Sequence, residues 1–229
     1  MNGFELEQEK PAATGLAQQY GTLDASCEDC MVLMSRYPDG HFDLAVCDPP
    51  YGIGADGGIG KYGKLKQAGN ANKWDSETPS PEYFTELFRV SKRQIIWGGN
   101  YFSLNPSRQW IIWDKGSGFA GRDFAEAEMA WCSWDGLVRI YRRDPLACRD
   151  YDNKIHPTQK PVALYRWLLQ NYAKPGQRVL DTHLGSGSIA IASHYFGTHL
   201  TACEIDADYF NAAMDRIRKE TRQLTFENA

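Results

Sequence analysis

Short apolar runs alternate with amphipathic segments along most of the 229-residue chain. The runs have the length and the Val, Ile, Leu and Trp content of buried strands. We expect seven strands, at 42–47, 94–97, 109–113, 128–134, 137–141, 178–181 and 199–203. Strands that alternate with helices at this spacing predict one α/β domain, with a mostly parallel sheet covered on both faces.

Four segments have the apolar periodicity and the end signals of helices. Ser80-Pro81-Glu82 begins the first helix, because Ser is a good N-cap and Pro suits the first helical position. The other three helices are expected at about 161–173, 188–196 and 206–222. Asp135-Gly136 lies between two expected strands and predicts a hairpin turn.

Composition and charge are those of an ordinary globular domain, with 42% hydrophobic residues, 24% charged residues and a net charge of −4. This balance argues against a highly basic, nonspecific nucleic-acid binder, although local basic patches matter more than the sum. No run approaches the length of a transmembrane helix, and residues 1–19 lack the apolar core of a signal peptide. We therefore expect a cytoplasmic protein without a membrane partner.

The six cysteines indicate neither a disulfide framework nor a metal centre. Cys47 and Cys203 lie within apolar runs and are expected to be buried thiols. Cys27 and Cys30 form a single C-x-x-C pair, and no second pair follows at the spacing of a zinc site. The sequence therefore predicts no metal.

Asp48-Pro49-Pro50-Tyr51 is the most informative segment of the chain. The two prolines cannot continue the preceding strand, because each lacks a backbone N–H and has a fixed φ. A carboxylate, a rigid turn and an aromatic ring therefore leave the carboxyl end of a strand together, where ligands bind in open α/β sheets. An amino group on a planar base can donate hydrogen bonds to Asp48 and to a proline carbonyl, while Tyr51 stacks on the ring.

A glycine-rich turn near the end of the chain predicts a nucleoside-type cofactor. The chain runs from an expected strand through Gly185 and Gly187 into a helix, whose free N–H groups suit an anion. Glu204 follows Asp181 by 23 residues, and an acid at about this distance can bind the hydroxyls of a ribose. The anion is either a pyrophosphate or the methionine carboxylate of S-adenosylmethionine. The candidate cofactor residues of this region are Asp181, Leu184, Gly185, Ser186, Gly187 and Glu204.

The order of three segments along the chain resembles that of a known enzyme family. Asp48–Tyr51 comes first, then His156-Pro157-Thr158-Gln159-Lys160-Pro161, then the glycine turn. This order and these residues resemble the β-group, or permuted, DNA amino-methyltransferases of the adenine-N6/cytosine-N4 family, over about residues 20–220. The resemblance implies a doubly wound, Rossmann-like sheet of seven strands, one of them antiparallel, and S-adenosylmethionine as methyl donor. It also implies that Thr158 and Lys160 help to hold the cofactor carboxylate.

The resemblance further implies methylation of a flipped-out DNA base at its exocyclic amine, with Asp48, Pro49, Pro50 and Tyr51 as the catalytic residues. Because the motif begins with Asp, it resembles the adenine-N6 enzymes more than the cytosine-N4 enzymes, which often carry Ser there. Two positions depart from the family, with His183 in place of Phe and Ser188 in place of Thr. An inactive nucleic-acid-binding subunit, or an enzyme acting on RNA or a protein amide, remains an alternative. A bacterial or phage source is expected.

Two basic stretches are candidates for contact with double-stranded DNA. Residues 54–75 are glycine-rich and aperiodic, which predicts a long mobile loop. The basic candidates in this loop and in the later stretch are Lys61, Lys64, Lys66, Arg142 and Arg143. No separate recognition domain fits between the catalytic turn and the 156–161 segment. DNA sequence reading is therefore expected from the 54–75 loop, from 115–126, from 142–155, or from the second subunit of a homodimer.

Overall fold

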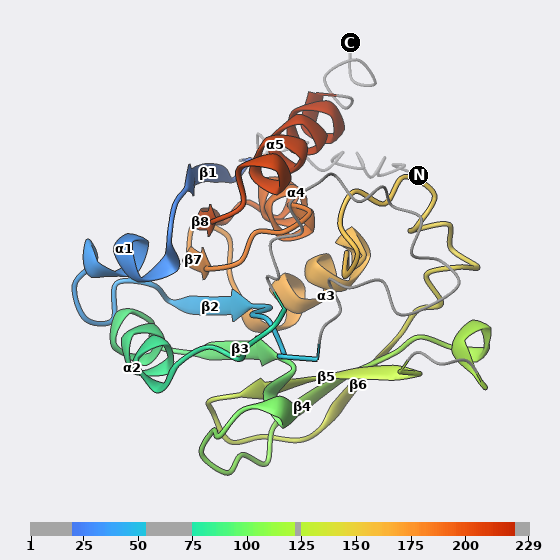
Figure 1. The fold of residues 1–229 in the computed structure, drawn as a ribbon, viewed down its shortest axis with the longest axis horizontal. Coiled ribbons are helices and arrows are strands. Elements are labelled where there is room, and N and C mark those ends of the chain that lie inside the picture. Colours follow the sequence, from blue (N-terminus) through green and yellow to red (C-terminus); the bar gives the residue numbers. More distant parts are fainter. Residues whose placement is uncertain (1–19, 54–74, 122–124, 223–229) are drawn as a thin grey trace, which may run out of the picture.

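A computed structural model describes residues 20–53, 75–121 and 125–222 (Figure 1). The strands are β1 (Thr22–Cys27), β2 (Leu44–Cys47), β3 (Gln94–Trp97), β4 (Trp110–Asp114), β5 (Ala127–Cys132), β6 (Arg139–Arg142), β7 (Arg178–Asp181) and β8 (His199–Glu204). The α-helices are α1 (Cys30–Ser35), α2 (Pro81–Val90), α3 (Val162–Tyr172), α4 (Ser188–Phe196) and α5 (Ala207–Arg222). Two short 3₁₀ helices are η2 (Gly99–Tyr101) and η3 (Ser117–Phe119). The loop predicted at 54–75 lies outside the described residues, apart from Asp75.

The eight strands form one sheet in the order β1-β8-β7-β2-β3-β5-β4-β6. Strand β5 runs antiparallel to its neighbours β3 and β4, and all the other neighbouring pairs are parallel. Helices α1 and α2 cover one face of the sheet, while α3, α4 and α5 cover the other (Figure 1). The prediction of a doubly wound, mostly parallel α/β sheet with one antiparallel strand is thus confirmed.

Two details of the predicted sheet are wrong. The described sheet has eight strands rather than seven, because the sequence pattern missed β1, a half-exposed edge strand in which polar residues interrupt the apolar ones. The predicted hairpin at Asp135-Gly136 does not form, since β6 pairs in parallel with β4, with Ile112 opposite Ile140. Strand β5 already has two neighbours, β3 and β4, so no edge of it is left for β6.

The predicted C-x-x-C pair spans the end of β1 and the start of α1. Asp29 between the two cysteines is the N-cap of α1, and its side chain accepts the backbone N–H of Met31 at 2.7 Å. All six cysteines are free thiols, and those in the middle of the sheet are buried. Within the described ranges, no cluster of His, Cys, Asp and Glu side chains could hold a metal ion.

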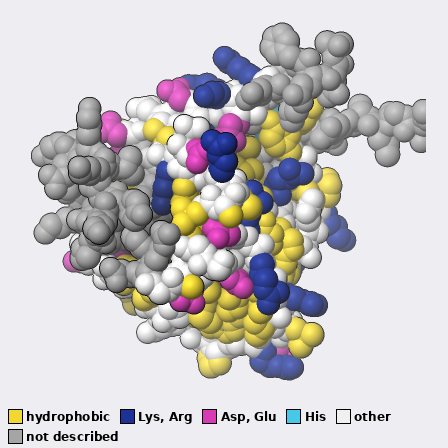
Figure 2. Space-filling model, turned by 90° about the vertical axis from the view of Figure 1, so that its right-hand side faces the viewer, with side chains coloured by type: hydrophobic (Ala, Val, Ile, Leu, Met, Phe, Trp, Pro, Cys, Tyr) yellow, Lys and Arg dark blue, Asp and Glu magenta, His cyan; other side chains and the backbone are white. Residues whose placement is uncertain are grey.

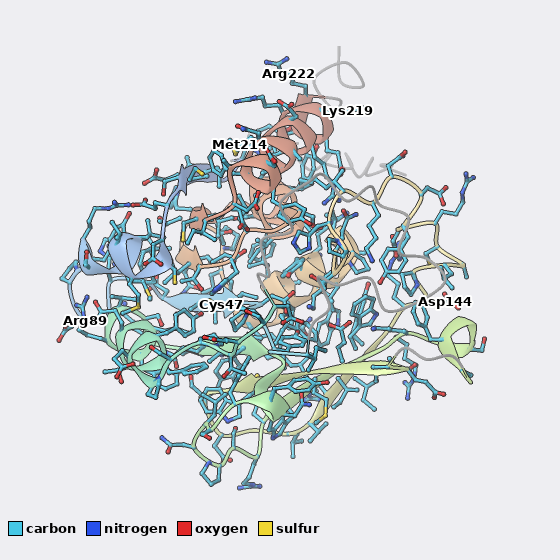
Figure 3. All side chains as sticks on the ribbon, in the orientation of Figure 1. Cys47, Arg89, Asp144, Met214, Lys219 and Arg222 are labelled. Atoms are coloured by element: carbon cyan, nitrogen blue, oxygen red, sulfur yellow. The ribbon has the colours of Figure 1, made fainter. Side chains whose placement is uncertain are left out.

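The sheet has an apolar cluster on each face, which explains why its central strands are continuous apolar runs. Trp97 and Trp113 are the largest fully buried side chains among the described residues. Cys47, at the end of β2, lies near the centre of the molecule, where many side chains converge (Figure 3). None of the described helices is long and apolar enough to cross a membrane. The rigid sheet thus fixes the positions of the residues that follow β2, β7 and β8.

Candidate active site

The candidate site lies where the connections of two neighbouring strands diverge. Strands β2 and β7 are adjacent, but the chain proceeds from β2 to β3 on one side and from β7 to β8 on the other. Such a divergence opens a crevice at the carboxyl ends of the strands. Asp48, Asp181 and Glu204 follow or end the neighbouring strands β2, β7 and β8 at the same edge of the sheet, and the charges of Asp48 and Glu204 contribute to the raised pKa of Asp181.

Both oxygens of the Asp48 carboxylate already have partners. The Tyr51 hydroxyl donates to Oδ1 at 2.6 Å, and the Lys160 ammonium lies 2.5 Å from Oδ2. Lys160 Nζ also lies 3.4 Å from the Tyr51 hydroxyl oxygen. The structure thus joins the catalytic turn directly to the 156–161 segment, which lies more than 100 residues away along the chain.

Asp75 braces the catalytic turn from outside the motif. Its buried Oδ1 accepts the backbone N–H groups of Tyr51 at 2.6 Å and Gly52 at 3.0 Å. The ring of Tyr101 stacks on Tyr51, with centroids 5.0 Å apart and planes 12° apart. In the described part of the chain, no donor is bound to the carbonyl oxygens of Pro49 or Pro50. These carbonyls therefore remain available to a ligand beside the Asp48 carboxylate.

Glu128 and Lys115 extend the ion pair of Asp48 into a row of alternating charges. Lys160 Nζ lies 3.0 Å from Glu128 Oε2, and Lys115 Nζ lies 2.7 Å from Glu128 Oε1. Glu128 reaches the site because β5 is antiparallel, so its first residues lie at the edge where β3 and β4 end. Sequence reasoning missed Glu128, although an acid within an otherwise apolar strand is the signal that could have identified it.

Burial and ion pairing have opposite effects on these groups. For Glu128, burial favours the neutral acid, but Lys160 and Lys115 outweigh it and lower the pKa to about 2. Burial likewise acts against a charged Lys160, but the adjacent Asp48 and Glu128 carboxylates raise its pKa above the usual value. The pKa of Asp48 is raised, because burial and the charge of Glu128 prevail over the effect of Lys160.

The glycine turn is held by backbone hydrogen bonds to Glu204. One carboxylate oxygen of Glu204 accepts the N–H of Gly185 at 2.9 Å, and the other accepts the N–H of Asp206 at 3.1 Å. Gly187 has a φ of +73°, and a Cβ there would lie 2.8 Å from the Cδ1 atom of Ile217. The turn therefore requires glycine at position 187, both for its backbone conformation and for its packing against α5.

The crevice is acidic. Burial raises the pKa of Asp181 to about 8, and the negative charges of Asp48 and Glu204 contribute to the rise. The pKa of Glu204 is raised as well, again chiefly by burial. A ligand that brings positive charge or hydroxyl donors into this crevice would offset the repulsion among the carboxylates.

The remaining predicted cofactor residues lie around the turn. Leu184 is buried and donates its N–H to the Cys203 carbonyl, and Ser186 accepts a hydrogen bond from Arg216 through its own carbonyl. The Thr158 hydroxyl lies 3.1 Å from Nδ1 of His156, and burial lowers the pKa of that imidazole to about 4. Lys160 lies at the Asp48 carboxylate, so its expected contact with the cofactor carboxylate stays a prediction.

The candidate DNA-binding residues are dispersed. Lys61, Lys64 and Lys66 lie outside the described residues. Arg142 is largely exposed and lies 3.2 Å from Asp114, whereas Arg143 makes a two-pronged ion pair with Asp150. Contact of any of these side chains with DNA stays a prediction.

Comparison with known proteins finds similarity to DNA methylases. A family model of the N6/N4 type, described as DNA methylase, matches residues 135–215. The putative methylase YubD of Escherichia coli K12 is 24% identical over 214 residues, which cover 86% of this chain and 90% of that protein. The resemblance to the N6/N4 DNA methylases is confirmed. The region matched by the family model begins after the Asp48–Tyr51 turn. It includes the 156–161 segment, the glycine turn and Glu204.

Two solved DNA methylase structures share the fold. The crystal structure of an M1.HpyAVI–SAM complex aligns with a TM-score of 0.56 and 16% identity, covering 85% of this chain and all of that chain. The cytosine-N4-specific PvuII DNA methyltransferase aligns with a TM-score of 0.57 and 14% identity, covering 89% of this chain and 92% of that chain. At these identities the likeness concerns the arrangement of strands and helices alone.

Replacing Gly98 by Ala should displace Tyr51. A Cβ at this position would lie 2.2 Å from Cε1 of the Tyr51 ring. Gly121 is a matched control, because its φ is +68° like that of Gly98, while nothing lies within 4 Å of its Cβ position. We expect Gly98→Ala to lower the free energy of unfolding by roughly 1–3 kcal/mol more than Gly121→Ala, as measured by urea denaturation. Equal losses in the two variants would show that Tyr51 is not packed against Gly98.

Replacing Asp181 by Asn should stabilise the ligand-free protein at alkaline pH. The pKa of Asp181 is raised to about 8 in the folded state, so its contribution to stability is fully present below about pH 4 and is lost as the pH rises through 8. Asn carries no such penalty. We expect the variant to gain roughly 2–5 kcal/mol over the natural protein at pH 9 and much less at pH 5, measured by urea denaturation. A difference independent of pH would contradict the assignment.

Proposed function

We propose that this protein is an S-adenosylmethionine-dependent DNA methyltransferase that modifies the exocyclic N6 of adenine in a flipped-out base. One observation carries the proposal: a half-buried carboxylate and two proline carbonyls without donors among the described residues lie at the end of β2, beside the crevice where the neighbouring β7 leads into the glycine turn. The carboxylate and the proline carbonyls can accept hydrogen bonds from an amine, and the crevice attracts a cationic cofactor. Their adjacency suits the transfer of a methyl cation equivalent from one to the other.

The crevice fits S-adenosylmethionine in charge and in donor chemistry. This cofactor supplies its methyl group from a positively charged sulfonium centre. A sulfonium bound here would favour the ionised form of Asp181, whose pKa is raised to about 8 in the ligand-free protein. Glu204 keeps acceptor capacity for ribose hydroxyls beyond its two backbone bonds. Thr158 and the turn at Leu184–Gly187 are the candidates for the methionine end. The M1.HpyAVI structure, which shares the fold, was solved as a complex with SAM.

Asp48 would orient the target amine. An exocyclic amine is a weak nucleophile, because its lone pair is conjugated with the ring. Hydrogen bonds from its two N–H groups to Asp48 and to a proline carbonyl favour a geometry in which the lone pair points at the methyl group. As the nitrogen–methyl bond forms and the sulfur–methyl bond breaks, the nitrogen becomes cationic and releases one proton. Ionised Asp48 is the adjacent acceptor for that proton.

Glu128 would act as a positioning residue through Lys160. The Lys160 ammonium stabilises the ionised form of Asp48, but an unbalanced cation there would oppose the developing positive charge on the amine. Glu128 compensates this charge at 3.0 Å and keeps Lys160 in place. The target amine can then replace Tyr51 or Lys160 as a hydrogen-bond partner of Asp48.

Adenine is proposed rather than cytosine because the motif begins with Asp48, as in the resemblance to adenine-N6 enzymes. A relative in fold, the PvuII enzyme, is named as cytosine-N4-specific, so N4-methylcytosine is the specific competing outcome.

The proposal is tested by incubating the protein with isotopically labelled S-adenosylmethionine and unmethylated genomic DNA, with RNA and protein as parallel acceptors. Mass spectrometry of the digested nucleosides should find labelled N6-methyladenine. Labelled N4-methylcytosine would retain the enzyme class and reject the base. Label in RNA or protein alone, or no transfer at all, would reject the proposal.

Replacing Asp48 by Ala should reduce methyl transfer to DNA by at least about 10³-fold, since it removes the acceptor for the amine hydrogens. Cofactor affinity, measured by calorimetry, should change by less than about tenfold, because Glu204 and the glycine turn remain. Asp135→Ala is the control, as Asp135 is an exposed acid paired with Arg108 at the surface. Full activity of the Asp48 variant would exclude the catalytic role.

A further inference from the structure

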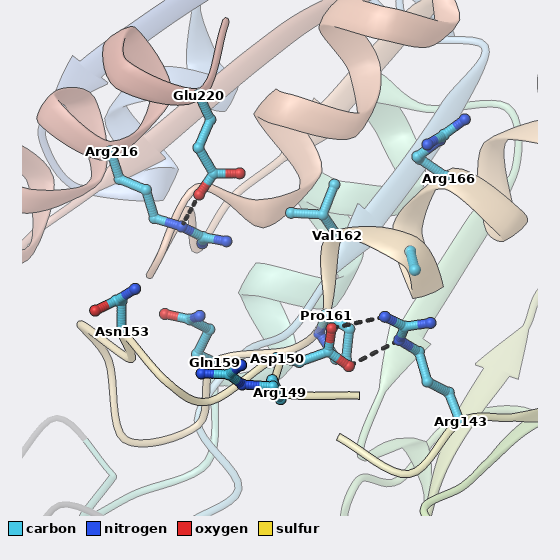
Figure 4. Close-up of a pocket in the computed structure, with 11 residues that line it drawn as sticks. Arg143, Arg149, Asp150, Asn153, Gln159, Pro161, Val162, Arg166, Arg216 and Glu220 are labelled. Carbon is cyan, nitrogen blue, oxygen red and sulfur yellow. Dashed lines mark hydrogen bonds and ion pairs between the residues drawn. The ribbon is translucent and has the colours of Figure 1, made fainter. Parts of the chain in front are cut away.

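A second hollow adjoins the active-site segment. Gln159 and Pro161, which flank Lys160, line a cavity of about 400 Å³ (Figure 4). Its other walls come from the first turns of α3, from the later part of α5, and from residues 143–153. The 143–153 segment lies on the right-hand side of Figure 1. Figure 2, which views the molecule from that side, shows several Lys and Arg side chains there.

Positive charge exceeds negative charge in the lining. Four arginines line the cavity, at positions 143, 149, 166 and 216, together with two acids, Asp150 and Glu220. Arg143 is paired with Asp150 and Arg216 with Glu220, as the dashed lines in Figure 4 mark. Arg149 is paired outside the lining with Asp152, and its side chain is 81% exposed. Arg166, on the exposed side of α3, has no ion pair with any residue that the structure describes.

Gln159 supplies a side-chain donor that has no partner among the described residues. The residue is only 5% exposed, and its Oε1 accepts the backbone N–H of Ile155. Its Nε2 makes no hydrogen bond within the described ranges, and the side chain borders the cavity in Figure 4. This amide N–H₂ therefore has donors available to a ligand oxygen in the cavity.

The start of α3 adds further donors at the same cavity. No side chain caps this helix, and the backbone N–H groups of Val162 and Ala163 have no acceptor among the described residues. The positive end of the helix therefore faces a cavity that Val162 and Ala163 themselves line. The Gln159 amide, the helix N–H groups and the guanidinium ions together are the kind of donor set that binds phosphate oxygens.

We infer that this cavity binds a backbone phosphate of the substrate DNA strand. The inference rests on the proposed function, because the cavity shares its wall with the segment that carries Lys160 to Asp48. The wall formed by α5 is connected to the glycine turn, since Arg216 donates to the Ser186 carbonyl at 2.9 Å. A phosphate bound here would anchor the strand whose base enters the Asp48 site.

The salt dependence of DNA affinity tests the inference. The double variant Arg149→Gln, Arg166→Gln removes two exposed cations of the lining and leaves the ion pairs of Arg143 and Arg216 intact. The charge-matched control is Arg108→Gln, Arg218→Gln, whose side chains are 76% and 59% exposed and lie outside the cavity. Affinity for a fluorescent duplex is measured over a KCl series, in the absence of methyl transfer.

We expect the slope of log Kd against log salt to fall by about one to two units in the cavity variant, with DNA affinity about tenfold lower at 0.15 M salt. The control variant should keep most of the salt-dependence slope of the natural protein. Equal slopes for the cavity variant and the natural protein would overturn the inference.

Calorimetry with inorganic phosphate and with a deoxynucleoside monophosphate distinguishes the source of the phosphate. We expect neither to saturate the protein below millimolar concentration. Tight binding of either, lost in the cavity variant while the DNA slope stays unchanged, would assign the cavity to a free ligand and overturn the DNA inference. If the natural protein methylates DNA and the slopes are equal, the inference fails alone. If it methylates nothing, the proposed function fails, and the slopes still report on the cavity.

Discussion

The ammonium of Lys160 lies buried between two carboxylates, Asp48 at 2.5 Å and Glu128 at 3.0 Å. A buried ion pair of this kind is stable only while each charge keeps its partners, because removal of one leaves another uncompensated in a medium that solvates it poorly. Lys115 completes the row on the other side of Glu128. The arrangement ties together three distant parts of the chain: the catalytic turn, the antiparallel strand β5 and the segment before α3.

The groups near Asp48 differ in the kind of ligand that they suit. On one side of Asp48 lie Tyr51 and the free proline carbonyls, which suit an amine. Asp181 and Glu204 lie at the same edge of the sheet, and burial is the main cause of their raised pKa values. The sheet order places these groups at one edge without any contribution from a separate domain in the described residues. The phosphate cavity that we infer adjoins the same segment, so strand anchoring, base orientation and cofactor binding would share Gln159, Lys160 and their neighbours.

The sequence predicted the parts of this site that depend on local pattern. Pro49 and Pro50 end the strand that precedes them, and Gly187 marks the turn between a strand and a helix. Both turns could therefore be placed before the structure was known. The buried run before Asp48 also predicted a central strand, which is β2. Asp48, Asp181 and Glu204 could each be placed after or at the end of an expected strand, where ligands bind in open α/β sheets.

Features that depend on strand pairing were not predictable in this way. The Asp135-Gly136 pattern indicated a hairpin, but a local turn signal does not reveal that both edges of β5 are already occupied. Strand β1 was missed because it lies at an edge, where polar residues replace half of the apolar ones. Glu128 and Asp75 were missed for a related reason, since each acts on a residue distant in sequence. The partner of Lys160 could be identified only from the sheet order.

The charge balance at Asp48 is tested most directly by the pH dependence of kcat for the natural protein and for Glu128→Gln. Asp48 and Lys160 face Glu128 within the site, and Lys115 and Lys154 are the further charged groups around it. Loss of the Glu128 charge removes an effect that raises the pKa of both Asp48 and Lys160. The account predicts that the acidic and alkaline limbs of the profile both move to lower pH, by roughly one unit. A lower kcat at every pH, with both limbs unmoved, would contradict it.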